Sequence, residues 1–107
     1  MNTNSLSDLL KEAGRVVAKQ RKLMGLSQSS LASRAGVNRT YISDLENGKR
    51  NFSLATLFAL SSSLNTTMAQ MVEEVEKGCL QNSHESHGQL SVHAYDANLE
   101  SVDVNEQ

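Results

Sequence analysis

The stretch SQSSLASRAGVNRTYISDLENGKRN, residues 27–51, carries the signals for two short helices joined by a tight turn. Ser27 is a good N-cap, because its hydroxyl can accept a hydrogen bond from a free N–H of the first helical turn. Gly36 follows the first helix, where a left-handed backbone costs glycine least. Asn38 caps the second helix, and Asn47-Gly48 ends it.

The second of these helices has two different faces. Ile42 and Leu45 lie three residues apart on one side, whereas Arg39, Thr40, Ser43 and Asp44 fall towards the other. The first helix has a small residue, Ala32, where the two helices would cross. Two short helices with a glycine turn and a polar, displayed N-terminal end predict a helix-turn-helix.

These residues resemble the phage repressor and Cro-like (Cro/C1-type, XRE) family of helix-turn-helix regulators. Within that family, RTYISDLENGKRN is most similar to the controller proteins of restriction-modification systems. The resemblance covers about residues 17–75, and it is carried by the spacing of Ala32, Gly36, Ile42 and Leu45 together with Gln28, Tyr41, Glu46, Asn47 and Gly48. It implies an all-α, five-helix domain, which we place at residues 1–77. Residues 78–107 lie outside the resemblance, and their composition predicts an acidic C-terminal extension.

Helix signals outside the central stretch agree with five helices. A first helix begins at Ser5 or Ser7 and ends at Gly25, and Gly14 leaves open whether its N-terminal turns form a separate piece. A fourth helix follows a cap at Ser53 and is broken at residues 65–66. A fifth begins after Thr66 or Thr67 and is expected to end at residues 77–78.

Length and composition favour a small protein without a large ligand site. The 107 residues are 38% hydrophobic, with only two Phe and two Tyr to fill a core. A lone Cys79 excludes an intramolecular disulfide, and no apolar run approaches the length of a membrane span. We expect a soluble, cytoplasmic protein that does not engage a membrane.

Charge is distributed unevenly along the chain. Residues 1–51 hold nine basic and four acidic side chains, a net of +5, whereas residues 52–77 carry −2 and residues 78–107 carry −5 with no Lys or Arg. This asymmetry is typical of a nucleic-acid face attached to an acidic extension. The alternative is a set of solvated helix faces with an acidic tail.

A displayed helix of this kind fits the major groove of double-stranded DNA, with its N-terminal residues nearest the base edges. Arg39 can donate twice to guanine, and Thr40 can set its methyl group against thymine. The resemblance implies that Arg39, Thr40, Ser43 and Asp44 read bases. For Asp44 a second role stays open, which is to orient Arg39.

Contacts to the DNA backbone are expected at both ends of the two helices. Free N–H groups at the start of the first short helix attract phosphate, and the resemblance implies that Gln28 helps there. The expected backbone set is Ser27, Gln28, Asn38, Tyr41, Asn47, Lys49, Arg50 and Asn51. The resemblance also implies a structural ion pair between Arg21 and Glu46.

The sequence also bears on oligomeric state, on the C-terminal segment and on catalysis. The apolar stripe Met68, Met71, Val72 and Val75 is expected to join a homodimer on a palindromic operator, with intramolecular packing as the alternative. Residues 89–105 alternate in a way typical of a marginal β-hairpin. Cys79, His84, His87 and His93 match no zinc spacing, and no catalytic or phosphate-binding motif occurs, so neither enzyme activity nor a cofactor nor a metal is expected.

The sequence therefore predicts a dimeric, sequence-specific transcriptional regulator that binds double-stranded DNA. The alternative is an antitoxin-like interaction module whose residues 78–107 bind a protein partner, with DNA binding serving only autoregulation.

Overall fold

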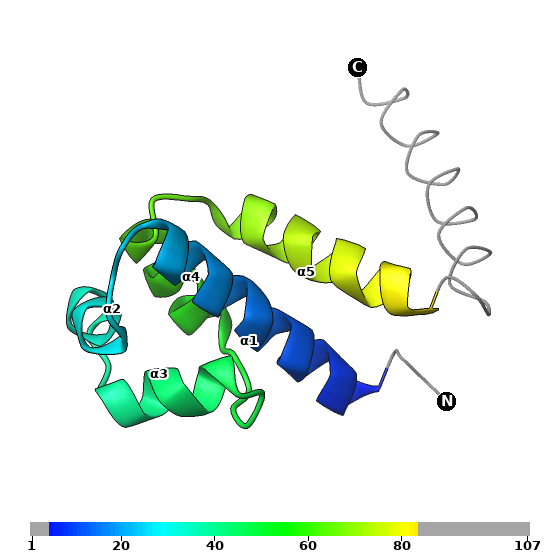
Figure 1. Cartoon of the computed structure of the whole chain (residues 1–107), viewed down its shortest axis with the longest axis horizontal. Helices are drawn as coiled ribbons and strands as arrows, with labels where there is room; N and C mark the ends of the chain where they lie inside the picture. Colours follow the sequence, from blue (N-terminus) through cyan, green and yellow to red (C-terminus); the bar gives the residue numbers. More distant parts are fainter. Residues whose placement is uncertain (1–4, 84–107) are drawn as a thin grey trace, which may run out of the picture.

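The computed structural model describes residues 5–83, which form five helices (Figure 1). The helices are α1 (Leu6–Leu23), α2 (Gln28–Ala35), α3 (Arg39–Glu46), α4 (Leu54–Ser63) and α5 (Met68–Ser83). Residues 5–83 contain no strand, and the expected all-α, five-helix domain is confirmed. The β-hairpin expected at residues 89–105 lies outside the described residues.

Each of the first four helices begins directly after a side chain that caps it. The Ser27 hydroxyl accepts a hydrogen bond at 2.9 Å and the Asn38 side-chain oxygen accepts one at 2.8 Å, each from the N–H three residues further on. Ser5 and Ser53 cap α1 and α4 in the same way. Because these bonds satisfy donors that the helices cannot satisfy internally, the local sequence is enough to place the starts of α2, α3 and α4, and the structure selects Ser5 over Ser7 for α1.

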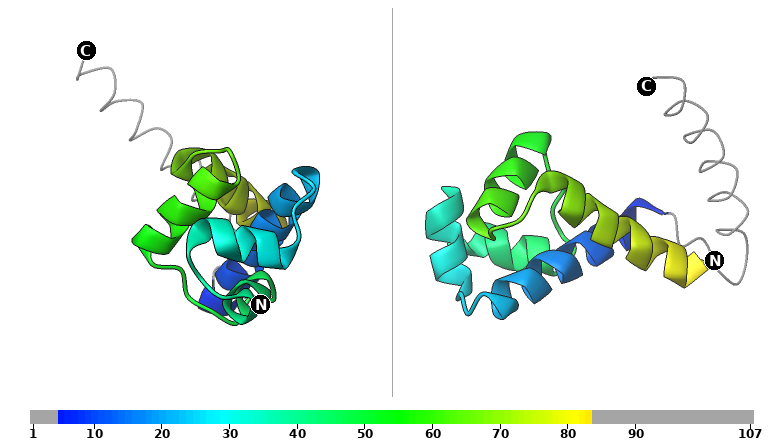
Figure 2. Two further views of the ribbon diagram at one scale, coloured as in Figure 1. Left: turned by 90° about the vertical axis from the view of Figure 1, so that its left-hand side faces the viewer. Right: turned by 90° about the horizontal axis from the view of Figure 1, so that it is seen from above.

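One apolar core joins all the helices. Its buried members are Val16, Val17, Leu31, Ala32, Ile42, Leu45, Leu60, Leu64 and Met71. Helix α1 packs against α5 on one side and against α3 on another, and α2 packs against α3 and α4 (Figures 1 and 2). Helix α3 is therefore held from behind by α1 and α2, while its opposite face is left to solvent.

Gly14 does not divide α1, which is continuous from Leu6 to Leu23. A Cβ at Gly14 would overlap the carbonyl oxygens of Leu45 and Glu46 at the end of α3. The glycine therefore serves the close crossing of α1 and α3.

Gly14→Ala is expected to lower the free energy of unfolding by about 1 to 3 kcal/mol, because the added methyl group forces α1 and α3 apart. Helix propensity alone predicts the opposite, a gain of about 1 kcal/mol. Urea unfolding measures the difference, and Ser7→Ala in the exposed first turn of α1 is the control. A stabilised Gly14→Ala protein would show that the crossing is not tight.

Helix α5 continues through Gly78 to Ser83, so the expected end at residues 77–78 is wrong. Gly78 is buried, and a Cβ there would overlap the side chain of Glu12 on α1. The glycine allows two helices to approach instead of ending one. The boundary placed after Lys77 therefore falls inside a helix. None of the helices in residues 5–83 has both the length and the apolar character needed to cross a membrane.

Candidate nucleic-acid interface

Helix α3 divides its residues between the core and the solvent. Ile42 and Leu45 are both 0% exposed, which fixes the rotation of the helix about its own axis. Arg39 and Thr40 are exposed at its N-terminal end, and Ser43 and Asp44 are half-buried along the same outer side. The four side chains expected to read bases thus lie on one accessible strip of α3.

The far end of α3 is tied to α1 by Arg21 and Glu46. The two side chains meet through a pair of hydrogen bonds of 2.6 and 3.0 Å, and they are only 11% and 7% exposed. Arg21 also donates to the carbonyl oxygen of Leu26 at 2.9 Å. The hydrogen bond to Glu46 raises the pKa of Arg21 above its ordinary value, so the guanidinium stays charged.

Gln28, at the start of α2, bridges the two ends of α3. Its amide nitrogen donates to Glu46 at 3.0 Å, and its amide oxygen accepts from Arg39 at 3.1 Å. A continuous polar chain therefore runs from Arg21 through Glu46 and Gln28 to Arg39. We call it the Arg21–Arg39 relay. It links the scaffold helix α1 to the exposed tip of α3.

The relay was not foreseen from the sequence, which assigned Gln28 to a phosphate. Its amide oxygen accepts from Arg39 and one of its two amide hydrogens is donated to Glu46, which leaves the second hydrogen for a phosphate. Within residues 5–83, Asp44 forms no ion pair with Arg39. It lies instead 3.6 Å from Arg50, whose guanidinium carbon sits 5.1 Å from the centre of the Tyr41 ring. The sequence pattern does not predict the contacts of Gln28 or of Arg50, because in each case the partner residues lie on a different segment of the chain.

Other expected contact residues lie at the two ends of the pair α2 and α3. Ser27 and Asn38 cap these helices, so their side-chain oxygens already accept backbone N–H groups. Asn47, Lys49 and Asn51 are exposed just beyond α3. The start of α2 and the segment after α3 thus flank the exposed strip with donors, which suits a polyanion.

The four apolar residues of α5 that were expected to form the dimer interface differ in their exposure. Met71 is 3% exposed and belongs to the core, so it is not available to a second copy of the chain. Val72 is 47% exposed, and Met68 and Val75 are half-buried. Among residues 5–83, no group of three or more His, Cys, Asp or Glu side chains could hold a metal ion.

Comparison with known proteins gives a consistent set of relatives. A family model described as Helix-turn-helix matches residues 17–71. The control protein C.MunI of Mycoplasma sp is 38% identical over 73 residues, which are 67% of this chain and 99% of that protein.

Solved structures add two similar proteins. The restriction-modification controller protein C.AhdI from Aeromonas hydrophila is 32% identical, with a TM-score of 0.57 over 58% of this chain and 94% of that one. The controller protein C.Esp1396I, solved as a tetramer with its natural 35 base-pair operator, is 30% identical, with a TM-score of 0.62 over 67% of this chain and 95% of that one.

Proposed function

Since this chain belongs to the Cro/C1-type helix-turn-helix family of transcriptional regulators, we propose that it acts as a homodimer on a palindromic operator. Each copy places α3 in the major groove of one half-site. The observation that carries the proposal is the exposed tip of α3, where the Arg21–Arg39 relay holds the guanidinium of Arg39 beside α2. A base-reading arginine is most selective when its side chain is positioned before binding.

The reading residues follow from their places on α3. Arg39 donates to guanine O6 and N7, and Thr40 contacts a thymine methyl group or a phosphate. Ser43 and Asp44 lie further along the groove, where Asp44 can accept from cytosine N4 while it stays close to Arg50. The similar protein C.Esp1396I engages a natural operator, which supports an operator as the target of this chain also.

We place phosphate contacts on both sides of the reading strip, which is the row of Arg39, Thr40, Ser43 and Asp44 on α3. The unpaired N–H groups at the start of α2, with Ser27 and Gln28, face one strand, and the segment with Asn47, Lys49, Arg50 and Asn51 faces the other. Asn38 and Tyr41 contribute at the start of α3. These contacts set position and orientation, and the bases set specificity.

A dimer is needed because one recognition helix covers only a few base pairs, and two must lie about 34 Å apart on one face of the DNA. The exposed apolar side chains suit such an interface. Leu54 is 73% and Phe58 is 61% exposed, one turn apart on α4, and Val72 is 47% exposed on α5. We place the interface on these residues, with Met68 and Val75 beside them and Met71 behind them in the core.

The test uses the DNA next to the protein's own gene, searched for an inverted repeat. Fluorescence anisotropy should show tight binding to the intact repeat and weak binding when one half-site is scrambled. A spacer lengthened by about five base pairs turns the half-sites to opposite faces of the DNA and should weaken binding equally. Equal affinity for all three DNAs would contradict a dimeric, sequence-specific regulator.

Arg39→Ala is expected to reduce specific binding by about 1 to 3 kcal/mol and to relax selectivity mainly at one base pair in each half-site. Competition between operators that differ at single positions measures this change. Arg34→Ala is the matched control, because Arg34 is an exposed arginine in the last turn of α2 and lies outside the reading strip. An unchanged preference would remove Arg39 from the reading set.

Lys49→Ala is expected to weaken binding to all DNA sequences alike. The slope of log K against log salt concentration should fall by about one, since one phosphate contact is lost. Lys77→Ala serves as the control, because the Lys77 ammonium lies on α5 beside Glu73 and Glu74. If both variants keep the parent slope, Lys49 is a solvated charge.

A further inference from the structure

A basic shelf lies on the outer face of α1. Arg15, Lys19 and Lys22 surround Ala18 and Leu23, and together they line a shallow hollow of about 420 Å³. Leu23 is 72% exposed, so the hollow pairs cationic groups with apolar surface that no other part of residues 5–83 covers. We call this group of five residues the α1 shelf.

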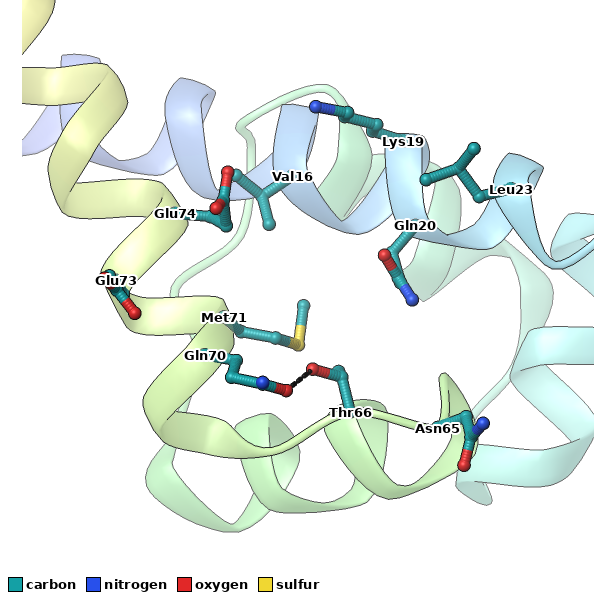
Figure 3. A pocket seen from close by; sticks show the side chains of 10 residues that line it. All are labelled: Val16, Lys19, Gln20, Leu23, Asn65, Thr66, Gln70, Met71, Glu73 and Glu74. Atoms are coloured by element: carbon teal, nitrogen blue, oxygen red, sulfur yellow. Dashed lines mark hydrogen bonds between the residues drawn. The ribbon is translucent and has the colours of Figure 1, made fainter.

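The cations of the α1 shelf lie to one side of the face of α1 that packs on α3. Gly14 marks the side of α1 that faces α3. At about 100° per residue, Arg15, Lys19 and Lys22 are turned by about 80° to 140° from that side. Lys19 and Leu23 also line a second hollow, of about 440 Å³, with Glu73 and Glu74 of α5 on its other side (Figure 3). DNA held by α3 would therefore leave the shelf uncovered.

Two cations of the shelf lack a partner in residues 5–83. Arg15 pairs with Glu12, but no ion pair of this part of the chain includes Lys19 or Lys22. Apart from Glu12, the acidic side chains beside the shelf are Glu73 and Glu74 of the adjoining hollow, and Lys77 lies within 4.0 Å of both. The chemistry of the shelf therefore suits a peptide that carries carboxylates and at least one apolar side chain.

Residues 84–107 have this chemistry. They hold five acidic side chains and no Lys or Arg, and their apolar side chains are interspersed with the acids. The acidic side chains are Glu85, Asp96, Glu100, Asp103 and Glu106. The matching family model ends at residue 71, before the acidic segment begins.

The end of α5 lies within reach of the shelf for a segment of this length. Helix α5 runs antiparallel to α1, because Met71 lines a hollow with Gln20 whereas Gly78 packs on Glu12 (Figure 1). From Glu12 to Lys22 along α1 is about 15 Å, and Ser83 lies about 8 Å beyond Gly78 in the opposite direction, so the segment has to bridge about 23 Å. A stretch of 24 residues can span up to about 80 Å.

We propose that residues 84–107 dock on the α1 shelf of their own chain. Their carboxylates meet Lys19 and Lys22, and an apolar side chain covers Leu23. Docking there keeps five negative charges on a flank of the domain, away from the face of α3 that meets the phosphates. The inference is independent of operator choice and is tested without DNA.

The experiment compares amide NMR spectra of two full-length proteins. The second carries Glu85→Gln, Asp96→Asn, Glu100→Gln, Asp103→Asn and Glu106→Gln. Shift differences within residues 5–83 should concentrate between Arg15 and Leu23, and they should be the same at low and at high protein concentration. Differences centred on residues 39–51 would put the segment on the DNA-facing side and overturn the proposal, as would the absence of differences.

A second pair of variants tests the lysines. Lys19→Gln with Lys22→Gln should abolish the differences that depend on the acidic segment, whereas Arg34→Gln on α2 should preserve them. Differences that survive the loss of both lysines would overturn the proposal. Differences that grow with protein concentration would also overturn it, because they would place the segment on a second copy of the chain.

Discussion

Arg21→Met is expected to lower the free energy of unfolding by about 3 kcal/mol, because it leaves a buried carboxylate without its cation. The Glu46 side chain is 7% exposed and receives two hydrogen bonds from Arg21, at 2.6 and 3.0 Å. After the substitution it retains the bond from Gln28, which supplies no positive charge. Methionine fills much of the space of the arginine stem, so the loss is mainly electrostatic.

Urea unfolding of both proteins at neutral pH measures the loss. Lys22→Met is the matched control, since Lys22 is an exposed cation one residue away on α1 and has no ion pair within residues 5–83. The control should change stability by less than about 0.5 kcal/mol. If Arg21→Met costs no more than Lys22→Met, the pair does not stabilise the domain.

Removal of both the Arg21 and the Glu46 charge distinguishes two roles of this ion pair. One is to stabilise the domain, and the other is to position Arg39 through Gln28. Arg21→Met with Glu46→Leu should recover part of the stability, because no buried charge is then left unpaired. Gln28 would still lose its acceptor, and Arg39 would lose the tether that Gln28 provides. We expect this double variant to be well folded but less selective at the base pair read by Arg39.

Phe58→Glu is expected to convert the proposed dimer to a monomer and to weaken operator binding by about 10²-fold or more, because two linked half-sites bind far more tightly than one. Phe58 and Leu54 are the most exposed apolar side chains of α4. A carboxylate at this position would have to be buried in the interface without a partner, which is costly. The monomer should fold normally, since the Phe58 side chain is outside the core.

Sedimentation measures the oligomeric state, and anisotropy compares an intact repeat with a single half-site. Leu6→Glu is the control, because Leu6 is also a large exposed apolar side chain, 57% exposed, in the first turn of α1 and outside the proposed interface. Only Phe58→Glu should lose the preference for the intact repeat. A dimeric Phe58→Glu protein would place the interface elsewhere. Met71→Glu cannot make this distinction, because a charge at a core position unfolds the domain.

Several features of this protein were determined by its sequence alone. Ser27, Asn38 and Ser53 cap the helices that they were expected to cap, because an N-cap acts on N–H groups only a few residues away. The burial of Ile42 and Leu45 likewise follows from helical periodicity, which leaves Arg39 and Thr40 on the opposite side. Interactions of such short range are fully specified by neighbouring residues.

Tertiary structure alone decided which residue meets which across the domain. Gly14 and Gly78 look like helix breakers in the sequence, yet both lie inside helices at close crossings with α3 and α1. The partners of Gln28 come from opposite ends of α3, and periodicity could not separate buried Met71 from exposed Val72. A helical pattern shows which side chains share a face, but the helix that covers that face is chosen by the packing of all five around one core.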